Sequence, residues 1–173
     1  VGELLGLLEH RHALERRLET AALTDELTGL PNRRAWEEAV ARELARAARD
    51  GQPVCVAVLD LDDFKRYNDQ RGQFAGDLLL TEAAEAWRAQ LRGGDVLGRY
   101  GGDQFAALIP GRPLEVALIV TERLRRATPQ GSGCSAGVAG WDGAESAVHL
   151  FARADAALYV AKESGRNRIA AAT

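Results

Sequence analysis

The stretch that most constrains the fold is residues 97–109, where two apolar, strand-like runs flank Gly101, Gly102, Asp103 and Gln104. Two such runs joined by a short glycine-containing segment predict a β-hairpin with a four-residue turn. Paired glycines allow positive φ and let a bulky anion approach, because no Cβ stands in the way. A carboxylate at the tip suits a metal ion that is itself bound to phosphate. The alternative is a surface hairpin whose tip simply contains turn-forming residues.

A second strong pattern is the fully apolar run at residues 54–59, which predicts a buried central strand. At its C-terminal end the run delivers a cluster of charged residues: Asp60, Asp62, Asp63 and Lys65. Open α/β sheets usually place ligands at such strand ends. Solvated turn residues are the alternative interpretation.

Helical patterns surround these strands. We expect helices at about residues 33–50, 64–69, 77–91, 113–127 and 146–164, and further strands at about 133–139 and 166–169. Asn32 is the expected N-cap of the first of these helices and Gly165 the end of the last. A loop over residues 71–77 would place Asp77 near a helix start, where it could simply complement the helix dipole. Strands and helices alternate irregularly, and this favours an α+β fold.

Residues 1–22 predict a separate helical segment ahead of a domain at residues 23–173. Its heptad a and d positions are apolar except for Arg11. They carry Leu4, Leu7, Leu14, Leu18 and Ala21. A coiled coil and an amphipathic helix packed on its own domain both fit this pattern.

Composition limits the remaining possibilities. A chain of 173 residues supports one domain with a real core. The net charge of −3 provides no basic field for nucleic acid. Cys55 and Cys134 lie in apolar runs and are most simply core thiols, rather than a disulfide or metal site. No run reaches the roughly 18 to 20 apolar residues of a membrane span. Because the chain lacks methionine, we expect a fragment of a longer protein.

Four separated segments together resemble the GGDEF domain of diguanylate cyclases. They are residues 25–34 (Asp-Glu-Leu-Thr-Gly-Leu-Pro-Asn-Arg-Arg), 60–65 with Asn68, 99–105 (Arg-Tyr-Gly-Gly-Asp-Gln-Phe), and 155–159 with Lys162 and 165–167. Their order and spacing match the family from about residue 23 to 170. The resemblance implies a mainly antiparallel central sheet surrounded by helices, like the palm of nucleotide cyclases and polymerases.

The resemblance also implies an activity: two GTP condense into cyclic di-GMP with loss of two pyrophosphates, and each subunit of a head-to-head homodimer holds one GTP. Two Mg²⁺ or Mn²⁺ ions per active site would assist attack of the 3′-hydroxyl on the α-phosphorus. By resemblance, the metal ligands are Asp60, the Leu61 carbonyl and Asp103. The catalytic residues are Asp60, Asp103 and Lys65.

Further roles carry over by resemblance. Asn68 and Asp77 match the guanine-reading pair, and Gly101 and Gly102 lie close to the nucleotide. Lys65, Lys162 and Arg166 match phosphate-contacting positions, although ordinary solvated charge also explains Lys162. Arg92 and Asp95 match the RxxD motif through which the product inhibits the family.

The sequence departs from the family at two positions. Gln104 stands where the family usually has Glu, and Gln73 stands where His is frequent. Losing an acid beside the metals is expected to weaken metal binding, so a slow cyclase competes with a silent module that binds cyclic di-GMP or GTP. A purely structural dimerisation domain is a third interpretation. We expect a cytoplasmic domain behind an N-terminal sensor, with membrane attachment open for the full-length protein.

Overall fold

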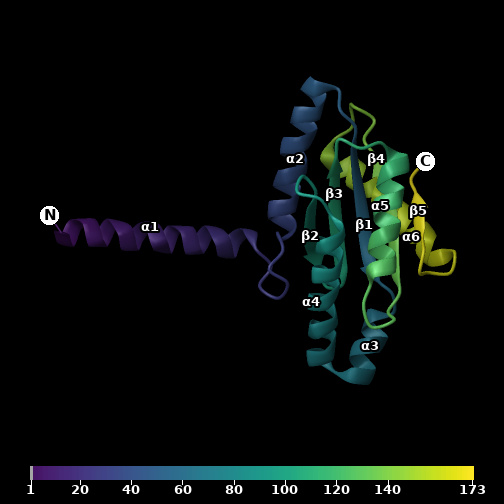
Figure 1. Ribbon diagram of the computed structural model, residues 1–173, viewed down its shortest axis with the longest axis horizontal. Coiled ribbons are helices and arrows are strands. Elements are labelled where there is room, and N and C mark those ends of the chain that lie inside the picture. Colours follow the sequence, from purple (N-terminus) through teal and green to yellow (C-terminus); the bar gives the residue numbers. More distant parts are fainter. Residues whose placement is uncertain (1) are drawn as a thin grey trace.

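The protein is described here by a computed structural model that covers residues 2–173. Its centre is a five-stranded sheet with the order β2-β3-β1-β4-β5 (Figure 1). All neighbouring strands are antiparallel except β4 and β5. The strands are β1 (Val54–Leu61), β2 (Val96–Gly101), β3 (Gln104–Pro110), β4 (Cys134–Gly140) and β5 (Ile169–Ala171). The predicted α+β architecture with a mainly antiparallel sheet is confirmed.

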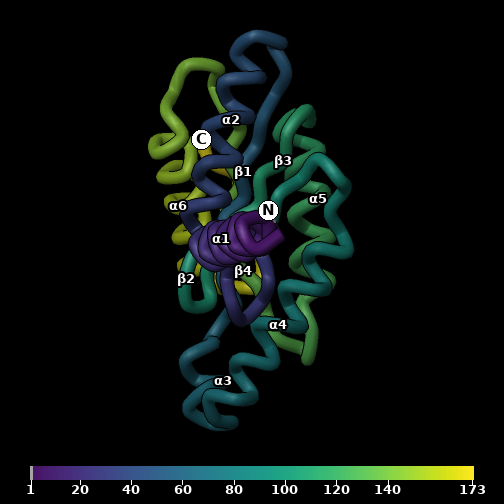
Figure 2. Tube along the Cα trace, turned by 90° about the vertical axis from the view of Figure 1, so that its left-hand side faces the viewer, coloured from purple at the N-terminus to yellow at the C-terminus, as the bar shows by residue number. Residues whose placement is uncertain are grey.

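Helices cover both faces of this sheet (Figures 1 and 2). They are α1 (Gly2–Leu23), α2 (Arg33–Asp50), α3 (Phe64–Arg71), α4 (Gln73–Gln90), α5 (Leu114–Ala127) and α6 (Ala147–Glu163). One core lies between the sheet and α2 with α6, where Val56 packs with Trp36 and Leu150. The other lies between the sheet and α4 with α5, where Leu59 packs with Trp87.

β1 is buried along its whole length, as its unbroken apolar run predicts. Because strand side chains alternate between faces, Val56, Val58 and Asp60 point to the side covered by α2 and α6. Asp60 is therefore the polar end of an otherwise apolar row. Its position is set by the burial of the residues before it.

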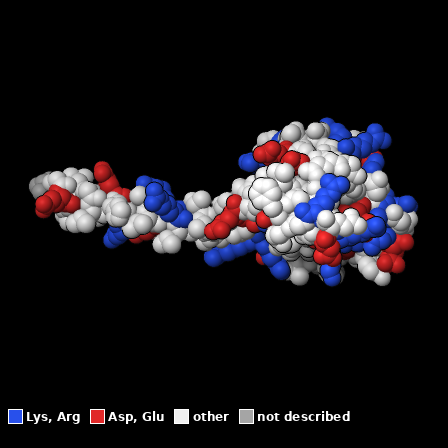
Figure 3. Space-filling view, turned by 90° about the horizontal axis from the view of Figure 1, so that it is seen from below, with Lys and Arg blue, Asp and Glu red and all other residues white. Residues whose placement is uncertain are grey.

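The N-terminal helix α1 leaves the domain and extends alone into the surroundings (Figures 1 and 3). None of its residues is buried, and the heptad leucines Leu4, Leu7 and Leu18 are 66%, 67% and 69% exposed. The apolar stripe therefore does not pack on its own domain, which was one of the two interpretations of the heptad pattern. Acidic and basic side chains are both present along its surface (Figure 3).

Asn32 joins α1 to α2. Its Oδ1 accepts a hydrogen bond of 3.0 Å from the amide of Ala35, so the predicted N-cap is confirmed. Its side-chain nitrogen donates to the carbonyl oxygen of Ala22, and its amide donates to that of Leu23, both at 3.0 Å. One residue thus caps the start of α2 and binds the end of α1.

Three sequence predictions about local structure are wrong. In place of the loop predicted at 71–77, a single residue, Gly72 with φ of 89°, separates α3 from α4. Because α4 begins at Gln73, Asp77 lies in its second turn and does not cap the helix. The final strand begins at Ile169, because Arg166 and Asn167 have positive φ and form a turn. The hairpin turn contains two residues rather than four, since Gly101 pairs with Gln104 and a bulge precedes it.

The cysteines behave as predicted. Cys55 and Cys134 are both free and buried. Burial raises the pKa of the Cys55 thiol to about 11 and raises that of Cys134 still further, so both are unreactive core groups. None of the helices within residues 2–173 combines the length and apolar character that crossing a bilayer requires.

Candidate active site

The hairpin tip lies beside the end of the buried central strand. Asp60 on β1 pairs with Gln104 on β3, and the amide of Leu61 donates to the carbonyl oxygen of Asp103 at 3.4 Å. The register of two antiparallel strands thus brings together acids that are 43 residues apart in the chain (103 minus 60). The structure places Asp60, Leu61 and Asp103, the three predicted metal ligands, together where the interior strand β1 ends and β3 begins.

Asp60 is a buried carboxylate, and only one of its two oxygens has a hydrogen-bond partner. Its side chain is 9% exposed, Lys162 on α6 donates to Oδ2, and Oδ1 is buried without a hydrogen-bond partner. Burial raises the pKa of Asp60 to about 6, the Lys162 ammonium opposes the rise, and the nearby Asp103 adds to it. A buried acceptor without a donor is costly, and a cation would satisfy it.

Asp103 sits half-buried in the two-residue turn. Burial raises its pKa, while hydrogen bonding to backbone and the charges of Lys162 and Arg99 oppose the rise. Leu61 can contribute only its carbonyl oxygen, because its side chain is a hydrocarbon that lies in the core. Two carboxylates and a carbonyl are hard oxygen donors of the kind Mg²⁺ and Mn²⁺ prefer. Within residues 2–173 no three His, Cys, Asp or Glu side chains converge as a ready metal cluster.

The Gln104 side chain is hydrogen-bonded to α6. Its Nε2 donates to Oδ1 of Asp155 on α6 at 3.2 Å. A glutamate at this position could not donate and would face Asp155 with a like charge. Asp155 entered the sequence argument only as part of a motif. Its spacing of seven residues from Lys162, two helical turns, is the signal that places both on one face of α6.

The predicted guanine-reading residues lie at the junction of α3 and α4. Oδ1 of Asn68 is buried without a partner, and it rests directly on Gly76, where an added Cβ would come within 1.6 Å of it. Asp77 follows Gly76 and accepts a hydrogen bond of 3.2 Å from Nε2 of Gln73. Asn68 and Asp77 thus place acceptor oxygens at this junction, that of Asn68 being covered by Gly76. Guanine offers N–H donors that adenine lacks in that arrangement.

The cations predicted to contact phosphate come from three separate segments. Lys65 is exposed on α3, and Lys162 reaches Asp60 from α6. Arg166 lies in the turn after α6, where its Nε is 3.9 Å from Oδ1 of Asp63. Gly101 and Gly102 are exposed at the hairpin tip with φ of 154° and 53°. The structure brings Lys162 directly to Asp60, whereas Arg166 lies beside Asp63 and Lys65 is exposed on α3.

Asp62, which the sequence groups with Asp60, has both of its side-chain oxygens hydrogen-bonded to other parts of the domain. Its Oδ1 accepts from the Ser135 hydroxyl at 2.6 Å, and its Oδ2 accepts from the Asn167 amide at 2.9 Å. Gly133 leaves room for it, since a Cβ there would lie 2.6 Å from Oδ2. Asp62, which directly follows β1, therefore holds the turn that contains Arg166 by a hydrogen bond.

Arg99 connects the hairpin tip to the segment between α1 and α2. Its guanidinium donates to Asp25 Oδ1 at 3.1 Å and to the Gly102 carbonyl oxygen at 2.8 and 3.0 Å. Burial acts to raise the pKa of Asp25, but hydrogen bonds from Thr28 and the Arg99 charge lower it overall. The opening motif and the hairpin therefore form one hydrogen-bonded unit.

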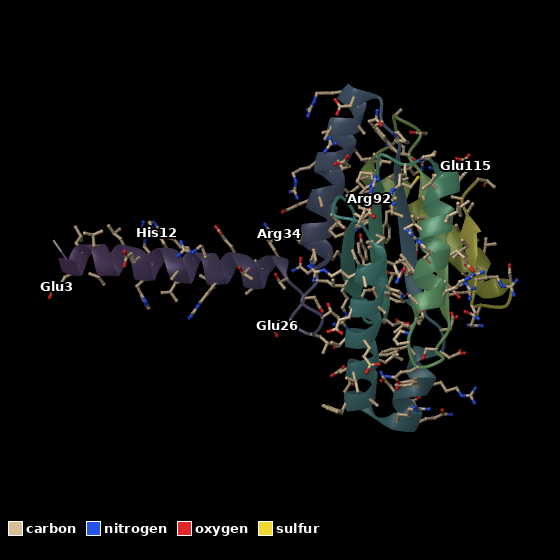
Figure 4. The ribbon with its side chains drawn as sticks, in the orientation of Figure 1. Glu3, His12, Glu26, Arg34, Arg92 and Glu115 are labelled. Atoms are coloured by element: carbon tan, nitrogen blue, oxygen red, sulfur yellow. The ribbon has the colours of Figure 1, made fainter. Side chains whose placement is uncertain are left out.

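Arg92 and Asp95 lie at the opposite end of β3 from Asp103. Figure 4 shows Arg92 in the same half of the domain as Glu115 at the start of α5, away from α3. The Arg92 side chain is 55% exposed, whereas that of Asp95 is fully buried. Asp95 is paired with Arg112 from the segment after β3, a residue that sequence reasoning missed. A single arginine after a strand gives no sequence signal of such a pairing.

Comparison with known proteins decides the family. The family model described as "Diguanylate cyclase, GGDEF domain" matches residues 22–168. This chain belongs to the GGDEF domain family. It is 44% identical over 170 residues to "Diguanylate cyclase DgcP" of Pseudomonas aeruginosa, covering 92% of this chain and 25% of that protein. It is 38% identical to "Diguanylate cyclase DgcM" of Escherichia coli over 166 residues, covering 40% of that protein. The chain thus spans less than half of these relatives.

Solved structures agree with the GGDEF assignment. The coiled coil and GGDEF domain of DgcB from Caulobacter crescentus, solved with c-di-GMP, superposes with a TM-score of 0.93 at 31% identity, covering 99% of this chain and 96% of that one. SiaD of Pseudomonas aeruginosa, in complex with its activator SiaC, gives 0.84 at 37% identity, covering 98% and 71%. The predicted family and fold are confirmed.

Proposed function

We propose that this GGDEF domain is a diguanylate cyclase that condenses two GTP into cyclic di-GMP and two pyrophosphates. The observation that carries the proposal is the pair of buried acceptors that have no partner, Asp60 Oδ1 and Asn68 Oδ1. One lies among the predicted metal ligands and the other among the predicted guanine readers. Both are oxygens that a nucleotide with its metal would satisfy.

The donor set fits divalent metal. Asp60, Asp103 and the Leu61 carbonyl would hold Mg²⁺ or Mn²⁺, two ions per active site. Bound metal lowers the pKa of the attacking 3′-hydroxyl and neutralises the pyrophosphate leaving group. Lys162 lies close enough to bind the same phosphates as a point charge, and Arg166 supplies a planar fork. Lys65 extends this cationic rim on the α3 side, and the Cβ-free tip at Gly101 and Gly102 leaves room for the nucleotide.

Base selection would depend on Asn68 and Asp77. Gly76 lets the Asn68 amide lie against α4, and Gln73 holds Asp77 by donating to one of its oxygens. Asp77 keeps a second oxygen for the base. A site built to hydrogen-bond guanine N–H groups rejects adenine, because its acceptors would remain unpaired.

Two active sites must face each other for the reaction, and α1 offers the means. Its outward leucines suit a second copy of α1 in a parallel coiled coil, which would pair two domains as a homodimer. The match of this whole chain to a coiled-coil GGDEF structure supports this arrangement. Because the relatives are longer, we also propose an N-terminal sensor domain that acts through α1 in the full-length protein.

A second candidate function rests on Gln104. A neutral amide bonded to Asp155 supplies no charge to the metals, so the domain would bind cyclic di-GMP at Arg92 and Asp95, or GTP at the active site, and signal without turnover. In the cyclase proposal, Arg92 and Asp95 would bind the product cyclic di-GMP, and this binding would inhibit turnover.

The deciding experiment is turnover. Purified protein incubated with GTP and Mg²⁺, or with Mn²⁺, should yield cyclic di-GMP by chromatography, and an Asp103→Asn variant should yield far less. An absence of product after long incubation at high protein concentration with both metals would favour the receptor function.

A further inference from the structure

The buried ion pair between Asp95 and Arg112 bears on the RxxD motif. Asp95 Oδ1 accepts from Nη2 of Arg112, and Oδ2 accepts from the Arg92 amide at 3.0 Å. The Asp95 side chain has no exposed surface, and that of Arg112 is 13% exposed. Both oxygens of this carboxylate are therefore engaged inside the protein, and none faces a ligand.

The Arg92 side chain, unlike that of Asp95, is exposed. Its Nη2 donates to the Pro110 carbonyl oxygen at 2.9 Å, and its Nε lies 3.8 Å from Asp95 Oδ1. Its side chain remains 55% exposed, so a face of the guanidinium is open for stacking or for phosphate. Of the two residues in the motif, one is accessible and the other is covered.

The ion pair is not ideally satisfied. Nε of Arg112 is buried and lacks a hydrogen-bond partner. A buried donor without an acceptor is costly, so release of Arg112 into solvent would recover hydration of that group. A competing hydrogen-bond donor can therefore displace Arg112 from Asp95.

Space for such a competitor exists beside the motif. A cavity of about 350 Å³ is lined by Arg88, Leu91, Arg92 and Asp95, together with Leu30 and Pro31 from the segment before α2. Its volume lies within the range of about 300–1,000 Å³ that is usual for small-molecule sites. It combines apolar walls with two arginines, and this suits a purine base attached to phosphate.

We propose that Arg112 is an internal competitor of cyclic di-GMP for Asp95, and that it sets the affinity of the inhibitory site in this chain. Because the Asp95 side chain has no exposed surface and Arg112 holds its Oδ1, guanine N–H groups can bond that oxygen only after Arg112 has left it, so the two contacts to Oδ1 exclude each other. The inference rests on the proposed function of Arg92 and Asp95 as a product site. It predicts weaker inhibition by product here than in a chain where Asp95 is not paired.

The test is a calorimetric titration of cyclic di-GMP into the parent protein and an Arg112→Gln variant. The Kd should fall at least about tenfold in the variant, because the carboxylate no longer has to break a buried charge-assisted bond. Added cyclic di-GMP should also raise the melting temperature of Arg112→Gln more than that of the parent. A purely structural role of Arg112 would lower stability without increasing affinity.

Matched variants sharpen the result. Arg153→Gln removes a comparable pair, in which Arg153 donates to Glu145, whose side chain is 4% exposed, and it should leave the Kd unchanged. Arg92→Ala introduced into Arg112→Gln should remove the gain, which locates binding at the motif. If Arg112→Gln fails to fold, Arg112→Lys replaces it, and an intermediate gain is expected because lysine forms a single bond.

A Kd that is equal or larger in both Arg112 variants, or no binding in any protein, would overturn the inference. Its failure is distinct from failure of the cyclase, because turnover of GTP by the parent is measured separately. A parent that makes cyclic di-GMP while both Arg112 variants bind it no better would contradict only the role of Arg112.

Discussion

Replacing Gln104 with glutamate tests how the active site tolerates its missing acid. In the structure Nε2 of Gln104 donates to Asp155 at 3.2 Å. The Gln104→Glu change removes that donor and brings two like charges together. Like charges about 4 Å apart repel by about 1 kcal/mol in water and about 4 kcal/mol at an effective dielectric of 20. Because Asp155 is exposed, the lower figure applies.

Adding about 1 kcal/mol for the lost hydrogen bond gives a total of about 2 kcal/mol. Without divalent metal, the melting temperature of Gln104→Glu should therefore fall by about 4–8 °C. With metal, the same carboxylate becomes favourable. The Kd for Mn²⁺, measured by electron paramagnetic resonance titration, should fall several-fold or more, and turnover of GTP should rise.

Two variants separate these effects. Gln73→Glu creates the same contact with Asp77, where the amide–carboxylate distance is also 3.2 Å, and it should lose stability without gaining metal affinity. Combining Gln104→Glu with Asp155→Asn should restore the metal-free stability and keep the metal affinity. A Gln104→Glu protein with unchanged Mn²⁺ affinity would refute the reasoning, because it would show that residue 104 does not act on the metals.

Three further predictions follow from named contacts. Arg92→Ala should relieve product inhibition, seen as turnover that no longer falls when cyclic di-GMP is added, and equal sensitivity in variant and parent would contradict the assigned site. Gly76→Ala should displace the Asn68 amide, with which its Cβ would overlap, and raise the Kd for GTP at least tenfold, whereas Gly93→Ala, which meets open space, should not. The lowered pKa of Asp25 means that its stabilisation is complete above about pH 4 and is lost as pH falls through its folded value. The difference in unfolding free energy between parent and Asp25→Asn, from urea titrations between pH 5 and pH 2.5, should therefore shrink on acidification, and a constant difference would argue against the Arg99 and Thr28 contacts.

Local patterns predicted the parts of this fold that depend on local physics. The apolar run of β1 and the N-cap Asn32 are each decided by neighbouring residues, and both were predictable. The start of α4 was not, because Gly72 and Gly76 look alike in sequence. Gly72 separates α3 from α4 with a positive φ, whereas Gly76 remains helical and leaves space for the Asn68 side chain. Only the tertiary contact distinguishes them.

The same limit applies to the site. Strand register decides that Asp60 meets the hairpin tip, and the order of motifs anticipated this. Adjacent acids gave no indication that Asp62 would bond Ser135 and the Asn167 amide while Asp60 kept an oxygen without a partner. The Arg112 pairing joins residues 17 apart across a strand, and no periodic pattern encodes it.

The junction at Asn32 has a consequence for how α1 and the domain are oriented. Because Asn32 binds the end of α1 and caps α2, its hydrogen bonds link the orientation of α1 to that of the domain. Each residue inserted into α1 would turn its leucine stripe by about 100° relative to the active site, whereas seven residues would change it by only about 20°. In the proposed homodimer, the angle at which the two active sites face each other would thus depend on the number of residues in α1, and an insertion of seven residues would change it little.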